Sequence, residues 1–147
     1  MTRVLGARLG ALTLLGDAAK GALPTLLALW WLQDLEHAAW VGVAALLGHC
    51  FSIFLRFRGG KGIAVALGVL LVLAPKSIPL LLTVWGLVFA RTRKSSLAGL
   101  VTTGVLVGAL LAVQPLRPLL PSVGLMAGVI VLRHTENIRR LLRGREL

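Results

Sequence analysis

The stretch WVGVAALLGHCFSIFLRFRGGKGIAVALGVLLVL, residues 40–73, places a cationic, glycine-rich segment between two apolar runs. Neither run has the polar face that a water-exposed helix needs, and apolar segments of this density are typical of a lipid bilayer. The segment between the runs concentrates cations beside glycines: His49, Arg56, Arg58 and Lys61. These residues alone leave two interpretations open, a positive anchor at a membrane face or a site that binds phosphate.

Composition extends this pattern to the whole chain. Its 147 residues are 57% hydrophobic and only 14% charged, yet the formal net charge is +11. Excess Lys and Arg in such a protein normally lie at the cytoplasmic face, so the charge need not indicate nucleic acid. No aromatic-interleaved basic face is present, and we expect no nucleic-acid partner. The lone Cys50 excludes an intrachain disulfide and a multi-cysteine metal site, and we expect neither metal nor cofactor.

Apolar segments recur along the chain at about 9–32, 38–55, 62–75, 78–90, 97–113 and 119–132. Their Leu, Ala and Val content favours helices over the alternating strands of a barrel. With the N-terminus inside, thirteen Lys and Arg fall on the inner side and only Lys76 and Arg117 outside. By the positive-inside rule, the sequence predicts an all-α polytopic helical membrane protein. We expect about six transmembrane helices, both termini cytoplasmic, and a single domain over 1–147.

Two pairs of glycines have the G-x-x-x-G spacing that lets helix backbones approach closely: Gly104 with Gly108, and Gly124 with Gly128. This spacing predicts helix packing rather than chemistry. Asp17 and Lys20 lie about one helical turn apart within the first apolar segment. Ionisable residues there are costly unless they are paired or face a cavity. A structural ion pair and a functional pair are both open.

The GGKG sequence at 59–62 favours the phosphate interpretation. Successive glycines can present several backbone N–H groups to one anion, and a following helix N-terminus adds its positive dipole. Arginine can add two parallel hydrogen bonds to phosphate. The pattern is not a Walker A loop, because Leu55 and Gly62 stand where that loop needs Gly and Ser or Thr.

Two further polar patches are expected on the same inner side, RTRKSSL at 91–97 and RHTENIRRLLRGRE at 133–146. The second could be a cationic helix lying on anionic lipid. His134, Glu136 and Asn137, however, are crowded against the membrane boundary. Ser95 and Ser96 of the first patch could also cap a helix. Three patches on one side of a small bundle predict a composite anion site, in an enzyme or in a small anion transporter.

Four stretches resemble one family in order along the chain. GHCFSIFLRFRGGKGIA resembles the G-H-x-F-P-x-F-L-x-F-x-G-G-K-G-V-A motif of the bacterial acyl-phosphate:glycerol-3-phosphate acyltransferases, the PlsY family. RHTENIRRLLRGRE looks like its R-H-x-x-N-I-x-R-L motif. LLGDAAKG and TRKSSLAGL are similar to its second membrane helix and its T-R-Y-x-S-L-A-S segment.

The resemblance implies a bacterial inner-membrane enzyme whose site faces the cytoplasm. It would transfer a fatty acyl group from acyl phosphate to the 1-hydroxyl of glycerol 3-phosphate, giving lysophosphatidic acid and phosphate. Its partners would be these substrates, membrane lipids and the acyl-phosphate-forming enzyme. Acyl phosphate already carries a good leaving group, so positioning and cationic stabilisation suffice without a nucleophilic side chain.

The resemblance also implies roles for individual residues. Lys61 and the backbone of Gly59, Gly60 and Gly62 would hold phosphate, and His49 would orient the loop or assist proton movement. His134 and Asn137 would complete the site by hydrogen bonding. Arg3 and Ser96 would contact substrate phosphate. Independently of the resemblance, the charges of Arg56 and Arg58 make them candidate phosphate ligands, with contact to substrate or to lipid both open. Asp17 and Lys20 are expected as a structural or site-supporting ion pair.

Two departures from the family pattern stand out. Ser52 replaces the usual proline. The family has seven membrane helices, and its first helix and G-S-x-N-x-G-A-T-N motif have no match here, because this chain starts at MTRVLG. We therefore expect one helix and the first motif to be lacking, which makes an inactive remnant a third alternative.

Overall fold

The computed structural model describes residues 2–112 and 114–145, with side chains at 6, 8–112 and 117–145. The described residues form helices and no strands, as the sequence predicts. The α-helices are α1 (Thr2–Leu32), α2 (Leu35–Cys50), α3 (Ile63–Leu73), α4 (Ile78–Thr92), α5 (Ser95–Ala112), α6 (Leu120–Arg133) and α7 (Thr135–Leu142). Short 3-10 helices lie at Ile53–Leu55, Pro75–Ser77 and Gln114–Leu119.

Helices α1 to α6 correspond to the six apolar segments expected from the sequence, whereas α7 lies within the polar C-terminal patch at 133–146. Length and composition qualify three described segments as membrane spans, Arg8–Leu32, Leu35–Leu55 and Ser95–Ala112. Arg117–Arg133 together with Thr135–Leu142 qualifies as a fourth if a 57° bend is allowed within one span. The expectation of six spans therefore stays a prediction.

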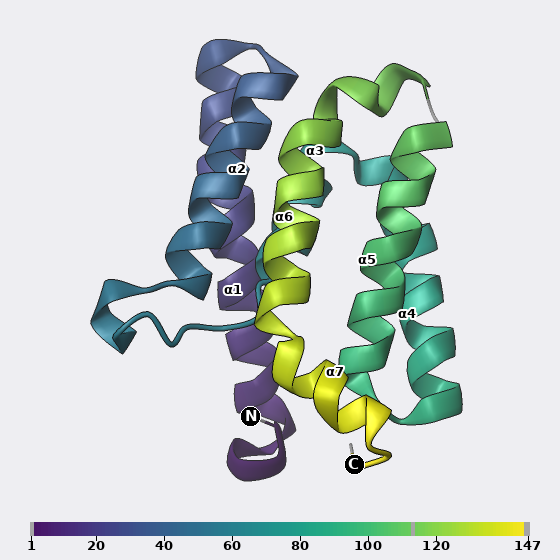
Figure 1. Ribbon diagram of the computed structural model, residues 1–147. Helices are drawn as coiled ribbons and strands as arrows, with labels where there is room; N and C mark the ends of the chain where they lie inside the picture. Colours follow the sequence, from purple (N-terminus) through teal and green to yellow (C-terminus); the bar gives the residue numbers. More distant parts are fainter. Residues whose placement is uncertain (1, 113, 146–147) are drawn as a thin grey trace.

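The connection between α1 and α2 is a tight polar turn. Gln33 adopts φ 50°, and the Asp34 side chain accepts a 2.8 Å hydrogen bond from the backbone N–H of His37, which caps α2. This backbone hydrogen bond is the main cause that lowers the pKa of Asp34 from its ordinary value. The turn lets α2 run back alongside α1 (Figure 1).

The closest helix packing joins α1 to α3, which is α1's most extensive neighbour. A Cβ at Gly21 would overlap the carbonyl oxygen of Val65, and a Cβ at Gly68 would overlap that of Ala18. Two backbones therefore meet where only glycine fits, as small residues allow in membrane bundles. This packing places α1 beside the start of α3, where the GGKG segment ends.

The G-x-x-x-G packing predicted for α5 and α6 is wrong within the described chain. A Cβ at Gly104, Gly108, Gly124 or Gly128 would meet nothing within 4 Å, and all four glycines are exposed. Both helices turn larger side chains toward the interior, among them Leu106 and Met126. Sequence spacing identifies a small-residue stripe but not the side of the helix on which neighbours lie.

The polar patches lie toward one end of the bundle. In Figure 1, the segment between α2 and α3 projects sideways in the lower half of the molecule. The same half holds the α4–α5 turn and α7. The fold thus gathers the three patches that the sequence separates by several tens of residues.

Candidate functional site

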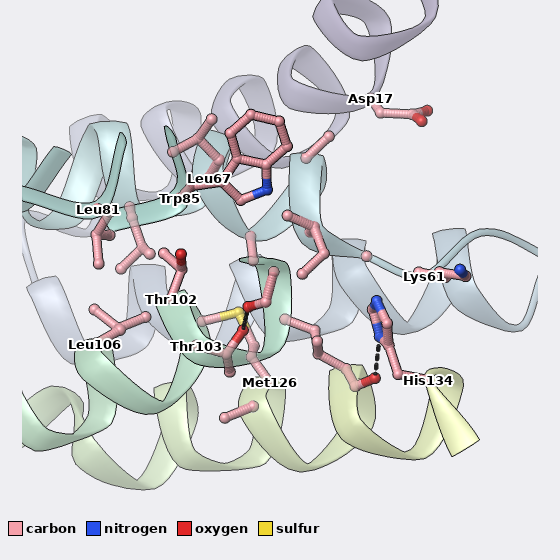
Figure 2. A pocket seen from close by; sticks show the side chains of 18 of the residues that line it. Asp17, Lys61, Leu67, Leu81, Trp85, Thr102, Thr103, Leu106, Met126 and His134 are labelled. Carbon is pink, nitrogen blue, oxygen red and sulfur yellow. Dashed lines mark hydrogen bonds between the residues drawn. The ribbon is translucent and has the colours of Figure 1, made fainter. Parts of the chain in front are cut away.

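A cavity of about 450 Å³ lies among α3, α4, α5 and α6. Its polar end is lined by Asp17, His49, Lys61, Ser96 and His134, together with Gly60 and Gly62. Its apolar end is lined by Leu81, Trp85, Leu106 and Met126, among others. Figure 2 shows the two ends well separated, with Lys61 and His134 at one and Leu81 and Leu106 at the other.

The glycine-rich segment forms the wall at the polar end, and its glycines are sterically required. A Cβ at Gly59 would overlap the carbonyl oxygen of His49, and a Cβ at Gly60 would overlap the His49 ring. Gly62 has φ 84°, in the left-handed region that favours glycine, and it is the N-cap of α3. The positive end of α3 therefore starts at the cavity, next to Lys61.

Arg133, at the end of α6, holds this segment in place. Its Nη2 donates a 2.6 Å hydrogen bond to the carbonyl oxygen of Gly59, and its Nε donates one of 3.2 Å to that of Gly60. The guanidinium carbon also lies 5.6 Å from the centre of the Phe51 ring. Sequence reasoning missed this role, because it treated Arg133 as an inner-face charge and as the first residue of the RHTENI stretch. The one available signal was its position directly before His134.

Two buried contacts order the junction of α6 and α7. His134 is 2% exposed, and its Nδ1–H donates a 2.7 Å hydrogen bond to the carbonyl oxygen of Ile130. Nδ2 of Asn137 donates a 2.6 Å hydrogen bond to Oγ of Ser96, and both residues are buried. This bond ties the start of α7 to the start of α5. The sequence predicted that these residues share a site, but not that Asn137 holds Ser96.

Asp17 forms the expected ion pair with Lys20 and reaches a second partner. Its Oδ1 lies 2.7 Å from Lys20 Nζ and 3.6 Å from His49 Nδ1. The His49 side chain is largely buried, whereas that of Lys20 is 62% exposed. Asp17 therefore connects α1 to the histidine on which the glycine-rich segment rests.

A second cavity of about 860 Å³ adjoins the first. Lys20, Ser52, Arg58 and Gly59 contribute to its lining, and Asp17, His49 and Gly60 line both cavities. The exposed Arg56 lines neither cavity. The side chain of Arg3 lies outside the part of the chain whose side chains the structure describes.

The chemistry available at the polar end is anion binding beside a hydrophobic chamber. Lys61, the glycine backbone and the N-terminus of α3 all favour negative charge. The described residues contain no group of three His, Cys, Asp or Glu side chains that could hold a metal ion. The Ser96 hydroxyl accepts a hydrogen bond from Asn137, which makes it a polar contact rather than a nucleophile beside a base.

The relatives of this chain share one description. The family model described as glycerol-3-phosphate acyltransferase matches residues 1–144. The glycerol-3-phosphate acyltransferase of Pseudomonas aeruginosa (strain LESB58) is 47% identical over 146 residues, covering 99% of this chain and 76% of the relative. That of Azotobacter vinelandii (strain DJ / ATCC BAA-1303) has the same identity and coverage.

Solved structures share the fold as well. PlsY (YgiH), an integral membrane glycerol 3-phosphate acyltransferase, matches with a TM-score of 0.93 and 35% identity in its lysophosphatidic acid form, covering 99% of this chain and 75% of that one. Its glycerol 3-phosphate form gives the same TM-score and covers 74% of that chain. The fold is thus that of an all-helical integral membrane protein. The chain belongs to the glycerol-3-phosphate acyltransferase family.

Proposed function

We propose that this chain transfers a fatty acyl group from acyl phosphate to the 1-hydroxyl of sn-glycerol 3-phosphate, giving lysophosphatidic acid and phosphate for phospholipid synthesis. The observation that carries the proposal is one cavity with an anion-binding end, at Lys61, and an apolar end, at Leu106. A fatty acyl phosphate has the same division into a charged head and an apolar chain. Family membership favours this reaction over the anion transporter.

In this proposal the acyl carbonyl lies between the anion-binding end and the apolar end of the cavity, where the hydroxyl of glycerol 3-phosphate attacks it. The 1-hydroxyl oxygen attacks the carbonyl carbon, a new C–O bond forms, and the C–O bond to phosphate breaks. Phosphate leaves with the bonding electrons, and the hydroxyl proton passes to a phosphate oxygen. No covalent enzyme intermediate is required, because the donor is already activated.

Each residue has a role that its placement supports. Lys61 and the backbone at 59–62 stabilise the charge of the departing phosphate. His134, buried at the cavity wall, hydrogen-bonds the reacting groups, while Asn137 orients Ser96 toward substrate phosphate. His49 supports the glycine-rich segment and offers a path for a proton.

The remaining cations are assigned by position. Arg58 and Lys20 border the second cavity and supply positive charge there, with Asp17 fixing Lys20. Arg3 is included on the sequence resemblance alone. Arg56 lines neither cavity, which argues against a substrate contact.

We place this single domain in the inner membrane of a bacterium, with six spans and with the site and both chain ends on the cytoplasmic side. The clustering of Arg and Lys patches toward one end of the bundle supports this orientation. An acyl-phosphate-forming enzyme would then supply the donor from the same side.

Radiolabelled glycerol 3-phosphate in proteoliposomes tests the proposal. Label should enter lysophosphatidic acid with acyl phosphate as donor, and Lys61→Ala should lower the rate of incorporation by about 10²–10³-fold. Incorporation only with acyl-CoA or acyl-carrier protein would overturn the donor assignment. Passage of unconverted label across the bilayer would indicate a transporter, and a folded chain without turnover would indicate a remnant.

A further inference from the structure

A short segment between α2 and α3 exposes an unusual density of apolar side chains. We call residues 52–58 the interfacial loop. Its exposed apolar residues are Ile53 (76%), Phe54 (97%), Leu55 (57%) and Phe57 (61%). The loop projects sideways from the bundle in Figure 1. Leu55 borders the second cavity, whereas Ile53, Phe54 and Phe57 line neither cavity.

The loop is an ordered structure. Its backbone closes on itself, because Ser52 O accepts hydrogen bonds from the N–H groups of Leu55 (3.1 Å) and Phe57 (2.9 Å). Arg56 and Phe57 adopt φ 49° and 62°, the left-handed region that non-glycine residues seldom occupy. Strained backbone of this kind persists where surrounding structure holds it, and it clusters at functional sites. The fold therefore maintains a shape that presents aromatic side chains outward.

We infer that the interfacial loop docks on the anionic surface of the lipid bilayer. Phe54 and Phe57 would lie at the boundary of headgroups and acyl chains, and Arg56 would bind lipid phosphate. The candidate span Leu35–Leu55 ends within the loop, which places the loop at the membrane boundary. Arg56 and Arg58 are both exposed beside the apolar side chains, and no acidic residue lies in the loop to offset them. Apolar side chains combined with cations are the composition that binds anionic interfaces.

This docking links the membrane surface to the polar end of the cavity. The loop continues directly into the glycine-rich segment, and Gly59 N–H donates a 3.2 Å hydrogen bond to Cys50 O, which closes the loop at its base. A lipid that holds the loop therefore also holds the segment that carries Lys61. The inference goes beyond the proposed function, and its test requires no turnover.

A nitroxide attached to Phe54→Cys in the full chain measures the position of the loop in vesicles. Cys50 is fully buried, and the parent chain serves as the labelling control. Accessibility to dissolved oxygen, which partitions into acyl chains, is compared with accessibility to a water-soluble nickel chelate. Labels at Leu26, within the first candidate span, and at Gln33, in the exposed turn between the candidate spans Arg8–Leu32 and Leu35–Leu55, give the membrane and water references.

We expect the label at position 54 to resemble the membrane reference and to be protected from the chelate. Phosphatidylglycerol added to phosphatidylcholine vesicles should deepen the label, since one arginine near an anionic surface shifts a bound-to-free ratio by about fivefold. Arg56→Gln should remove most of that dependence. Chelate accessibility equal to that at position 33 would overturn the docking, because the loop would then face water in a vesicle that holds lipid and no protein partner. Insertion unaffected by phosphatidylglycerol and by Arg56→Gln would overturn the assignment of Arg56 to lipid phosphate.

Discussion

Arg133 Nη2 lies 2.6 Å from the carbonyl oxygen of Gly59, a residue 74 positions earlier in the chain. The arginine that precedes His134 thus binds backbone carbonyls of the glycine-rich segment, and its charge is used in holding that segment. Because Arg133 is the last residue of α6, these hydrogen bonds fix the glycine-rich segment, which includes Lys61, to α6. A cation beside an anion site can therefore serve as a positioning group.

Replacing Arg133 with Gln should loosen the glycine-rich segment. We expect kcat/KM for glycerol 3-phosphate to fall on the order of 10²-fold, the effect of a small misplacement of binding groups. Thermal unfolding should also show a loss of about 1.5 kcal/mol, the lower end for hydrogen bonds to charged groups because the side chain is half-buried. Arg133→Lys, which keeps one donor, should recover part of the activity.

Arg139→Gln is the matched control, because Arg139 is exposed on α7. It should leave both unfolding and kinetics near those of the parent. An equal loss in Arg139→Gln, or full activity in Arg133→Gln, would contradict the positioning role.

Lys61→Ala should lower kcat/KM by about 10²–10³-fold, the range seen when a group that stabilises developing charge is removed. Its side chain is exposed, so we expect little change in the unfolding temperature. Lys76→Ala, in the α3–α4 connection, removes an equal charge at a residue that does not line the cavity and should be neutral. Comparable kinetics in the two variants would argue against phosphate binding by Lys61.

Gly60→Ala should displace the His49 ring, which the new Cβ would overlap. The displacement separates His49 from Asp17 and changes the wall of both cavities. A loss of kcat/KM on the order of 10²-fold is expected for such a misplacement. Gly86→Ala, whose Cβ would meet nothing within 4 Å, provides the steric control. Unaltered turnover in Gly60→Ala would show that the segment relaxes freely.

Gly68→Ala and Gly108→Ala should differ in their effect on the free energy of unfolding. Gly68→Ala forces a Cβ against Ala18 O and should cost at least about 1–3 kcal/mol, as overpacking does, in a thermal unfolding assay. Gly108→Ala meets open space and should be neutral or stabilising by up to about 0.5–1 kcal/mol, because alanine favours the helix. Destabilisation by Gly108→Ala would restore the packing interpretation of the G-x-x-x-G pattern.

Thr102→Phe should shorten the apolar chamber, since Thr102 lines the cavity and is only partly buried (Figure 2). Activity with long-chain acyl phosphates should fall more than activity with short-chain ones. Thr83→Phe adds the same bulk at an exposed position on α4 outside the cavity and should not change the chain-length profile. An unchanged profile in Thr102→Phe would place the acyl chain elsewhere.

Much of this architecture could be predicted from sequence, because bilayer constraints leave few alternatives. Apolar length gave the helices, and the clustering of cations placed Lys61, Ser96 and His134 on one side. The orientation of each helix could not be predicted in this way. Gly104 and Gly108 have the expected spacing, yet the contacts are made by Gly21 and Gly68, because packing depends on which face meets a neighbour.

For the site too, the sequence predicts the kind of chemistry but not which residues contact one another. Charge and glycine content predicted anion binding at Lys61. Residue type does not tell, however, which acceptor a given arginine side chain binds. Arg56 and Arg133 are both arginines close to the segment in sequence or in space, but Arg56 is exposed and Arg133 binds Gly59. The bond between Asn137 and Ser96 likewise joins residues 41 positions apart and leaves no local signal.

The shared wall of the two cavities carries a consequence for the affinities of two ligands. Asp17, His49 and Gly60 line both spaces, so a ligand that shifts the glycine-rich segment in one space alters the other. Linkage requires this influence to be reciprocal, with each ligand changing the affinity for its counterpart by the same factor. Because the two cavities share these residues, the occupancy of one cavity enters the binding equilibrium of the other.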